Sequence, residues 1–173
     1  MEIVNSNLTD LPKIFDLYRV AAEYMKSKNQ VYYPEFPKEL ILKEIEEKRQ
    51  WKIIIDGQIA CIWAITQNDE LIWGNKNNEA SVYIHRISTN PKFRGQNLVK
   101  QIVNWANDYC KKNRLKFIRM DTVGFNNGLI NHYEKLGFDF LGTKELENTD
   151  GLPNHYNDGE VCLFQIEVDL NSC

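Results

Sequence analysis

One turn of the chain combines a glycine, two cations and the start of a helix, a combination that binds phosphate. The pattern predicts a strand over residues 81–89, and after Asn90-Pro91 the chain reads Lys92-Phe93-Arg94-Gly95-Gln96-Asn97 before an amphipathic helix. A helix N-terminus presents unbonded backbone N–H groups, and its dipole adds about half a positive charge there. Arg94 and Lys92 would add full charges. The turn is therefore a candidate anion site, with an ordinary helix start as the alternative.

Two common phosphate-binding motifs do not fit this turn. A Walker loop requires GxxxxGK[ST], which the sequence lacks. A dinucleotide fingerprint requires GxGxxG, and this turn contains only Gly95. A nucleotide triphosphatase and a Rossmann-type dehydrogenase are thus excluded as explanations of the turn.

The turn does resemble the coenzyme-binding motif of the GNAT superfamily of N-acetyltransferases. In that family an Arg or Gln is followed by two residues, Gly, one residue, then Gly or Ala, usually as Arg-Gly-x-Gly-x-Gly. Arg94 and Gly95 match, whereas Asn97 and Val99 stand where the family commonly has glycines. Because glycine lets a backbone approach a ligand closely, these two replacements are departures from the family pattern.

A second stretch, residues 126–138, is similar to the family's Asn-x-x-Ala-x-x-x-Tyr-Glu-Lys-Leu-Gly-Phe pattern, with Leu129 in place of alanine. The matching residues are Asn126, Tyr133, Glu134, Lys135, Leu136, Gly137 and Phe138. With the element order, the resemblance covers nearly the whole chain. It implies an α/β fold with a mixed, mostly antiparallel sheet and helices on both faces.

The resemblance also implies an acetyl-CoA-dependent N-acetyltransferase. The acetyl group would pass to a primary amine of a small molecule or peptide by direct attack in a ternary complex. Acetyl-CoA would be the co-substrate, without a metal. The implied coenzyme-binding residues are Ile87, Ser88, Thr89, Arg94, Gly95, Gln96, Asn97, Leu98, Val99, Asn126 and Tyr133.

The implied chemistry requires proton transfers. An amine of pKa ~10 must lose its proton before it attacks, and the tetrahedral intermediate needs N–H donors, here expected at Ile87 to Thr89. Tyr133 matches the family position that protonates the departing thiolate; alternatively its ring only packs on the sheet. His85 is a candidate base, as are Asp121 and Glu79, although His85 is equally plausible as a half-buried histidine and Asp121 as an ion-pair partner of an arginine. Deprotonation through water is also open.

The acceptor is not encoded in a motif. Aromatic side chains in the first two helices and the sheet are candidates for its pocket, although core packing competes for them: Tyr24, Tyr32, Tyr33, Phe36, Trp63 and Trp73. An acidic segment would attract a cationic amine or would simply be a solvated loop: Glu145, Glu147, Asp150, Asp158 and Glu160.

Periodicity gives the elements that must position these residues. Residues 67–79 are polar and are expected to form a loop or an irregular strand extension, and residues 145–160 a loop. Asp56-Gly57 is expected to form a tight hairpin turn. We expect strands over 2–4, 51–55, 58–66, 81–89, 117–123, 138–143 and 161–169, and helices over 9–25, 37–48, 96–113 and 127–136.

Composition bounds the class of protein. The 173 residues are 43% hydrophobic and 26% charged with a net charge of −3, which is typical of a globular domain and gives no bulk field for nucleic acid. We expect one domain over 1–173, a monomer or homodimer in the cytoplasm, with no membrane or nucleic-acid partner. The cysteines (61, 110, 162 and 173) and the three histidines are too dispersed for a zinc site.

Two other functions compete. A non-catalytic acyl-CoA-binding sensor or regulatory module would keep the fold without the reaction, and the replaced glycines favour it. A scaffold without coenzyme would act by dimerisation, if the amphipathic strand over 161–169 lies at a sheet edge.

Overall fold

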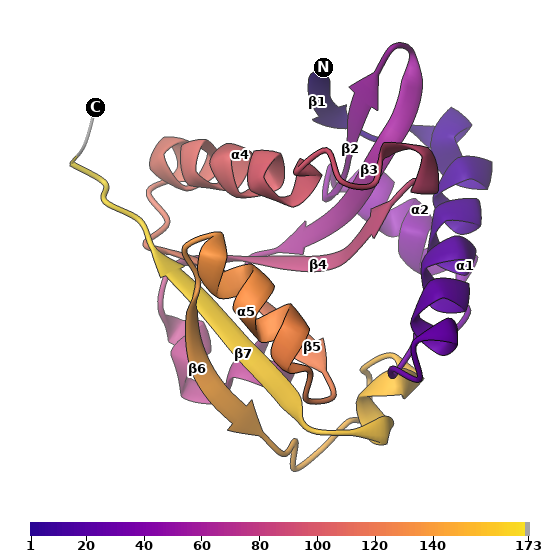
Figure 1. Ribbon diagram of the computed structural model, residues 1–173. Coiled ribbons are helices and arrows are strands. Elements are labelled where there is room, and N and C mark those ends of the chain that lie inside the picture. The colour runs from indigo at the N-terminus through magenta and orange to yellow at the C-terminus, as the bar shows by residue number, and fades with distance from the viewer. Residues whose placement is uncertain (172–173) are drawn as a thin grey trace. The chain divides into compact units, whose positions relative to one another are not determined.

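Glycine and asparagine turns divide the chain into short elements. Figure 1 shows the computed structural model, which describes residues 1–171. Cys173 lies outside the described residues. Contacts group the chain into two compact units, the first made of Met1–Ile65 with His85–Val99, and the second of Thr66–Ile84 with the described residues from Lys100 on. Each unit is described in turn. The single domain expected from the sequence stays a prediction.

Unit 1 contains an antiparallel sheet and two helices. Its strands pair in the order β1-β2-β3, with Ile53 opposite Cys61. The hairpin between β2 and β3 turns through Asp56 and Gly57, both left-handed at φ 50° and 72°, which confirms the predicted tight turn. The elements are β1 (Glu2–Asn5), η1 (Leu8–Asp10), α1 (Leu11–Ser27), α2 (Lys38–Glu46), β2 (Gln50–Ile55), β3 (Gln58–Thr66), the end of β4 (Ser81–Thr89) and η3 (Pro91–Phe93).

The core of unit 1 lies between its two helices and β3. The apolar positions of α1 recur every three or four residues, so they form one face that packs against α2 and the sheet. The buried residues of this core are Ile14, Leu17, Tyr18, Phe36, Ile41, Ile45 and Ile62.

Unit 2 is a mixed sheet with its own helices. Its strands lie in the order β4-β5-β7-β6, with β4 parallel to β5 and the other pairs antiparallel. The elements are α3 (Glu70–Trp73), η2 (Gly74–Asn78), the start of β4, α4 (Leu98–Asn113, which begins in unit 1), β5 (Phe117–Val123), α5 (Asn127–Lys135), β6 (Asp139–Lys144), η4 (Asn154–Asp158) and β7 (Val161–Glu167). The predicted α/β class with a mixed, mostly antiparallel sheet flanked by helices is confirmed.

Several predictions about elements need correction. The segment over 67–79 is not a loop, because it forms α3 and η2 around the buried Trp73. The first long helix, α1, begins at Leu11 instead of 9, after the η1 turn that Asn7 caps, and α4 begins at Leu98 instead of 96. The strand β7 ends at Glu167 and lies between β5 and β6, so the edge strand required by the scaffold hypothesis is not β7.

The helices of the described residues include none with the length and apolar character needed to cross a membrane.

Candidate active site

The turn between β4 and α4 is anchored at its first residue. In unit 1 the backbone N–H of Asn90 donates to the Ala60 carbonyl at 2.9 Å, and its side-chain Nδ2 donates to the Ile59 carbonyl at 3.0 Å. The Asn90 side-chain oxygen accepts from the Lys92 N–H at 3.2 Å. Phe93 is buried, whereas residues 94–97 are all exposed. The turn is thus fixed on β3 and open along the stretch that was predicted to bind phosphate.

Two residues of this turn are left-handed, Gly95 at φ 80° and Asn97 at φ 54°. Asparagine is one of the few residues other than glycine that adopts this conformation readily, so Asn97 performs the conformational task of the glycine it replaces. Left-handed residues alternating with others direct successive backbone N–H groups to one side, which forms an anion-binding concavity. The departure at Asn97 therefore leaves the backbone geometry available.

The cation of the turn is held by an aromatic ring. The Arg94 guanidinium lies 4.3 Å from the centroid of the Tyr24 ring on α1, and the Lys28 ammonium lies 5.8 Å from the same centroid. Tyr24 is 46% exposed, so this ring is a surface feature rather than part of the core. Both cations lie at the surface of unit 1, where they are available to an anion.

The strand β4 changes conformation before it reaches the turn. Its parallel register with β5 runs from Ser81 opposite Phe117 to Ile84 opposite Met120. Arg86 is then left-handed at φ 54°. In a strand of strict alternation Tyr83, His85 and Ile87 would share a face, but the left-handed Arg86 interrupts the alternation between His85 and Ile87. Tyr83 is fully buried, whereas His85 and Ile87 are half-buried.

The two predicted coenzyme residues of unit 2 have structural contacts. The Asn126 side chain accepts from the Leu129 N–H at 3.0 Å and caps α5. The Tyr133 ring lies 5.1 Å from that of Phe164 on β7 and 5.8 Å from that of Phe138, with 8% of the residue exposed. The Tyr133 ring thus packs against neighbouring rings, as one of its two interpretations predicted. A catalytic role of its hydroxyl stays a prediction.

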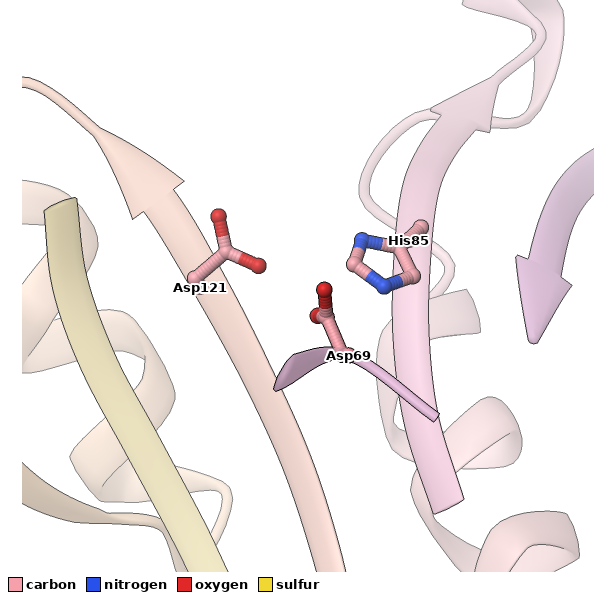
Figure 2. Close-up of side chains that lie close together, drawn as sticks. All are labelled: Asp69, His85 and Asp121. Atoms are coloured by element: carbon pink, nitrogen blue, oxygen red, sulfur yellow. The ribbon is translucent and has the colours of Figure 1, made fainter. Parts of the chain in front are cut away.

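Asp121 lies among polar groups of unit 2 at the end of β5. It accepts a hydrogen bond from the Tyr156 hydroxyl at 2.8 Å, and a carboxylate oxygen of Asp69 lies within 4.8 Å of one of its own. Figure 2 shows these two carboxylates with His85, drawn on the elements that carry them. His85 and Asp121 are the residues that follow the last parallel pair, Ile84 and Met120. Asp69 and Tyr156 were not predicted from the sequence, because both lie in polar segments that were expected to be loops.

Arg119, the arginine of β5, forms an ion pair with Glu79. Arg119 is fully buried, and it donates to the Glu79 carboxylate, to Gln165 at 2.8 Å and to the Lys76 carbonyl at 2.5 Å. The Arg119 guanidinium lowers the pKa of Glu79, which makes this carboxylate a weaker base than an ordinary one. The lowered pKa disfavours Glu79 as the general base, and Glu79 is an ion-pair partner of Arg119.

The aromatic candidates for the acceptor pocket separate by burial. Trp63, Trp73 and Phe36 are buried in the cores, Tyr33 is half-buried, and Tyr24 and Tyr32 are exposed. The acidic residues over 145–160 are all exposed, as a solvated loop would be: Glu145, Glu147, Asp150, Asp158 and Glu160.

Comparison with known families finds a match over most of the chain. The model described as the acetyltransferase (GNAT) family matches residues 12–138. The uncharacterized N-acetyltransferase YesJ of Bacillus subtilis is 31% identical over 74 residues, which are 43% of this chain and 41% of that protein. The match thus spans less than half the length of this relative.

Solved structures share the fold over nearly the whole chain. A GNAT-family acetyltransferase from Listeria monocytogenes superposes with a TM-score of 0.77 at 24% identity, covering 96% of this chain and 94% of that one. The Salmonella typhimurium protein yncA, determined with its cofactor acetyl-CoA, superposes with a TM-score of 0.70 at 12% identity, covering 100% of this chain and 96% of that one. At these identities the likeness shows the fold.

Proposed function

The chain belongs to the acetyltransferase (GNAT) family, and from this premise we propose that it transfers the acetyl group of acetyl-CoA to a primary amine. The acceptor is an unidentified small molecule or peptide, and the amine attacks the thioester directly in a ternary complex. The observation that carries the proposal is the exposed turn before α4, in which Gly95 and Asn97 are both left-handed. The proposal is also supported by the similarity in fold to yncA, whose structure contains acetyl-CoA.

The coenzyme's pyrophosphate binds at the turn. The backbone N–H groups of residues 95–99 and the N-terminus of α4 supply donors and partial positive charge, and Arg94 supplies a full charge. The pantetheine arm runs along Ile87 to Thr89 at the end of β4. Asn126 and Tyr133 complete the coenzyme site at its thiol end. The proposed reaction uses no metal, because N–H groups, an O–H group and side-chain cations are the groups proposed to stabilise its charges.

The reaction requires the amine to be neutral. A base removes its proton, its lone pair attacks the thioester carbonyl, and the C–S bond breaks as the tetrahedral intermediate collapses. Backbone N–H groups at Ile87 to Thr89 stabilise the developing oxyanion. The coenzyme leaves as a thiolate, which receives a proton from the Tyr133 hydroxyl. The attacking nitrogen, now cationic, loses its second proton through water to the Tyr133 phenolate, and the base releases the first proton to solvent.

The base is drawn from the strand ends that follow the last β4–β5 pair. His85 and Asp121 each come one residue after the last parallel pair, Ile84 and Met120, and each is a candidate base. An imidazole ordinarily titrates in the range in which a base at neutral pH must work. The half-buried carboxylates of Asp69 and Asp121 in unit 2 support an acceptor that arrives as a cation.

A panel of amines tests the proposal. The purified protein is incubated with acetyl-CoA and with polyamines, aminoglycosides, amino acids or peptides with free N-termini, and products are identified by mass spectrometry. We expect one class of amine to gain 42 mass units at a rate above the uncatalysed reaction. Binding of acetyl-CoA without acetylation of any amine would instead favour the acyl-CoA sensor.

A further inference from the structure

We propose that Glu44 is a positioning residue, which holds Arg86 in its left-handed conformation and so sets the backbone of β4 that receives the thioester. The inference rests on the proposed function and deepens it. It concerns unit 1 alone, where Glu44 lies in α2 and Arg86 in β4.

The conformation of Arg86 needs an external cause. Arg86 has φ 54° within a strand that runs from Ser81 to Thr89. Arginine, unlike asparagine, gains no local hydrogen bond that offsets the strain of this conformation, so the surrounding structure must enforce it. Ile87, the next residue, begins the stretch whose N–H groups are proposed to bind the thioester oxygen. The conformation of Arg86 therefore decides where these donors point.

The far end of the Arg86 side chain is fixed. Its terminal nitrogen donates to Glu44 Oε1, and only 10% of the Arg86 side chain and 4% of the Glu44 side chain are exposed. The guanidinium carbon lies 5.0 Å from the centroid of the Phe36 ring and 5.7 Å from that of Tyr18. With the cation held in this cage, the backbone of Arg86 cannot relax to an extended strand without drawing the charge away from Glu44.

Glu44 is fixed in its turn. Its backbone carbonyl accepts from the Arg49 N–H at 2.7 Å, and its Oε1 lies 3.7 Å from an Arg49 guanidinium nitrogen. Arg49 directly precedes β2. The Glu44 carboxylate on α2 therefore contacts both Arg49, next to β2, and Arg86 on β4. A change at Glu44 therefore reaches the β4 backbone through Arg86.

Stability alone explains this pair poorly. Glu44 Oε2 and Arg86 Nε are buried without a hydrogen-bond partner among the described residues. In a buried ion pair that leaves polar atoms unsatisfied, the attraction between the charges offsets little or none of the free energy of desolvation. Apolar residues often replace such pairs without loss of stability. A role in holding one backbone conformation accounts for the pair better.

The test compares glycine with alanine at position 86 after Glu44 has been neutralised. Glu44→Gln removes the charge that holds Arg86, and we expect kcat to fall about tenfold or more while the Kd for acetyl-CoA changes less than about threefold. In the double variant E44Q/R86G both charges are absent and glycine adopts φ 54° freely, so kcat recovers to within about threefold of the native value. The matched control E44Q/R86A is equally uncharged but keeps a Cβ, and its kcat stays low.

Each outcome decides the question. Recovery in the glycine variant but not in the alanine variant supports the positioning role, because only backbone freedom separates the two. Equal kcat values for the two double variants overturn it, and so does an unchanged kcat in Glu44→Gln. If neither double variant folds, by circular dichroism, the pair is a stability element and the proposal is overturned. Absence of turnover in the native protein with every amine would instead count against the proposed function.

Discussion

Gly95 and Asn97 stand two residues apart in the turn before α4, and both are left-handed, at φ 80° and 54°. The second is one of the two positions, with Val99, at which this chain departs from the glycines common in its family. Asparagine adopts the required conformation at a smaller cost than other side chains, so the departure changes the residue and preserves the backbone.

The turn predicts a distinct order of effects at position 97. Asn97→Gly keeps the left-handed conformation accessible and should leave the Kd for acetyl-CoA within about threefold of the native value. Asn97→Val places a β-branched side chain in a conformation that costs about 1–3 kcal/mol, so the Kd should rise about 5- to 150-fold. Calorimetric titration measures both. Equal affinities for the two variants would show that the backbone of residue 97 takes no part in binding.

Removal of the Tyr133 hydroxyl should affect turnover more than stability. The ring packs against Phe138 and Phe164, and phenylalanine preserves these contacts. Because Tyr133 is proposed to protonate the thiolate, Tyr133→Phe should lower kcat about a hundredfold and leave the urea midpoint nearly unchanged. An unchanged kcat with the same acceptor removes Tyr133 from the mechanism.

Asp121 is expected to matter for its charge. Asp121→Asn keeps an oxygen that accepts from the Tyr156 hydroxyl but removes the carboxylate, and kcat/KM should fall about tenfold or more. Tyr156→Phe is the matched control, since it removes the donor and keeps the charge, and it should cost less than about threefold. If kcat/KM falls further in Tyr156→Phe than in Asp121→Asn, the effect belongs to the conformation of the η4 segment and not to the Asp121 charge.

Much of this arrangement was predictable from sequence because its signals are local. The strands at 81–89 and 117–123 and the hairpin at Asp56-Gly57 have the predicted bounds, since turn residues punctuate them. The short helix α3 was missed because its single apolar turn, Leu71 to Trp73, lies within a polar segment. It is held by distant contacts, such as the hydrogen bond from Lys144 Nζ to the Ile72 carbonyl at 2.9 Å.

The ion pairs of the two units were also not predictable, because their partners are distant in the sequence. Glu44 and Arg86 are 42 residues apart, and Glu79 and Arg119 are 40 apart. No periodicity or motif connects residues at such separations, and only the folded chain selects one partner among many charges. The left-handed conformation of Arg86 likewise has no sequence signal, because arginine does not favour it.

The buried thiols predict loss of stability in alkali. Burial raises the pKa of Cys61 to about 11 and that of Cys110 to about 12, above the ordinary value of about 8.5 that the unfolded chain has. The folded state therefore holds these protons more tightly. The free energy of unfolding should be constant with respect to them below about pH 8 and should fall as pH rises from about 9 towards 11.

Urea titrations between pH 8 and pH 10.5 measure this loss. Cys61→Ala with Cys110→Ala should flatten the dependence, once the loss of stability common to all pH values is subtracted. A steep alkaline loss that persists in this double variant would assign it to other groups.

Binding of acetyl-CoA at the turn is the central claim, and calorimetric titration of the native protein beside Arg94→Ala tests it most directly. The account predicts micromolar binding to the native chain and a Kd raised about tenfold or more by Arg94→Ala, because a cation facing the pyrophosphate is lost. Lys28→Ala, which removes a neighbouring cation outside the turn, should change the Kd less than about threefold. Absence of binding at millimolar acetyl-CoA, or equal affinity in native protein and Arg94→Ala, would contradict the account.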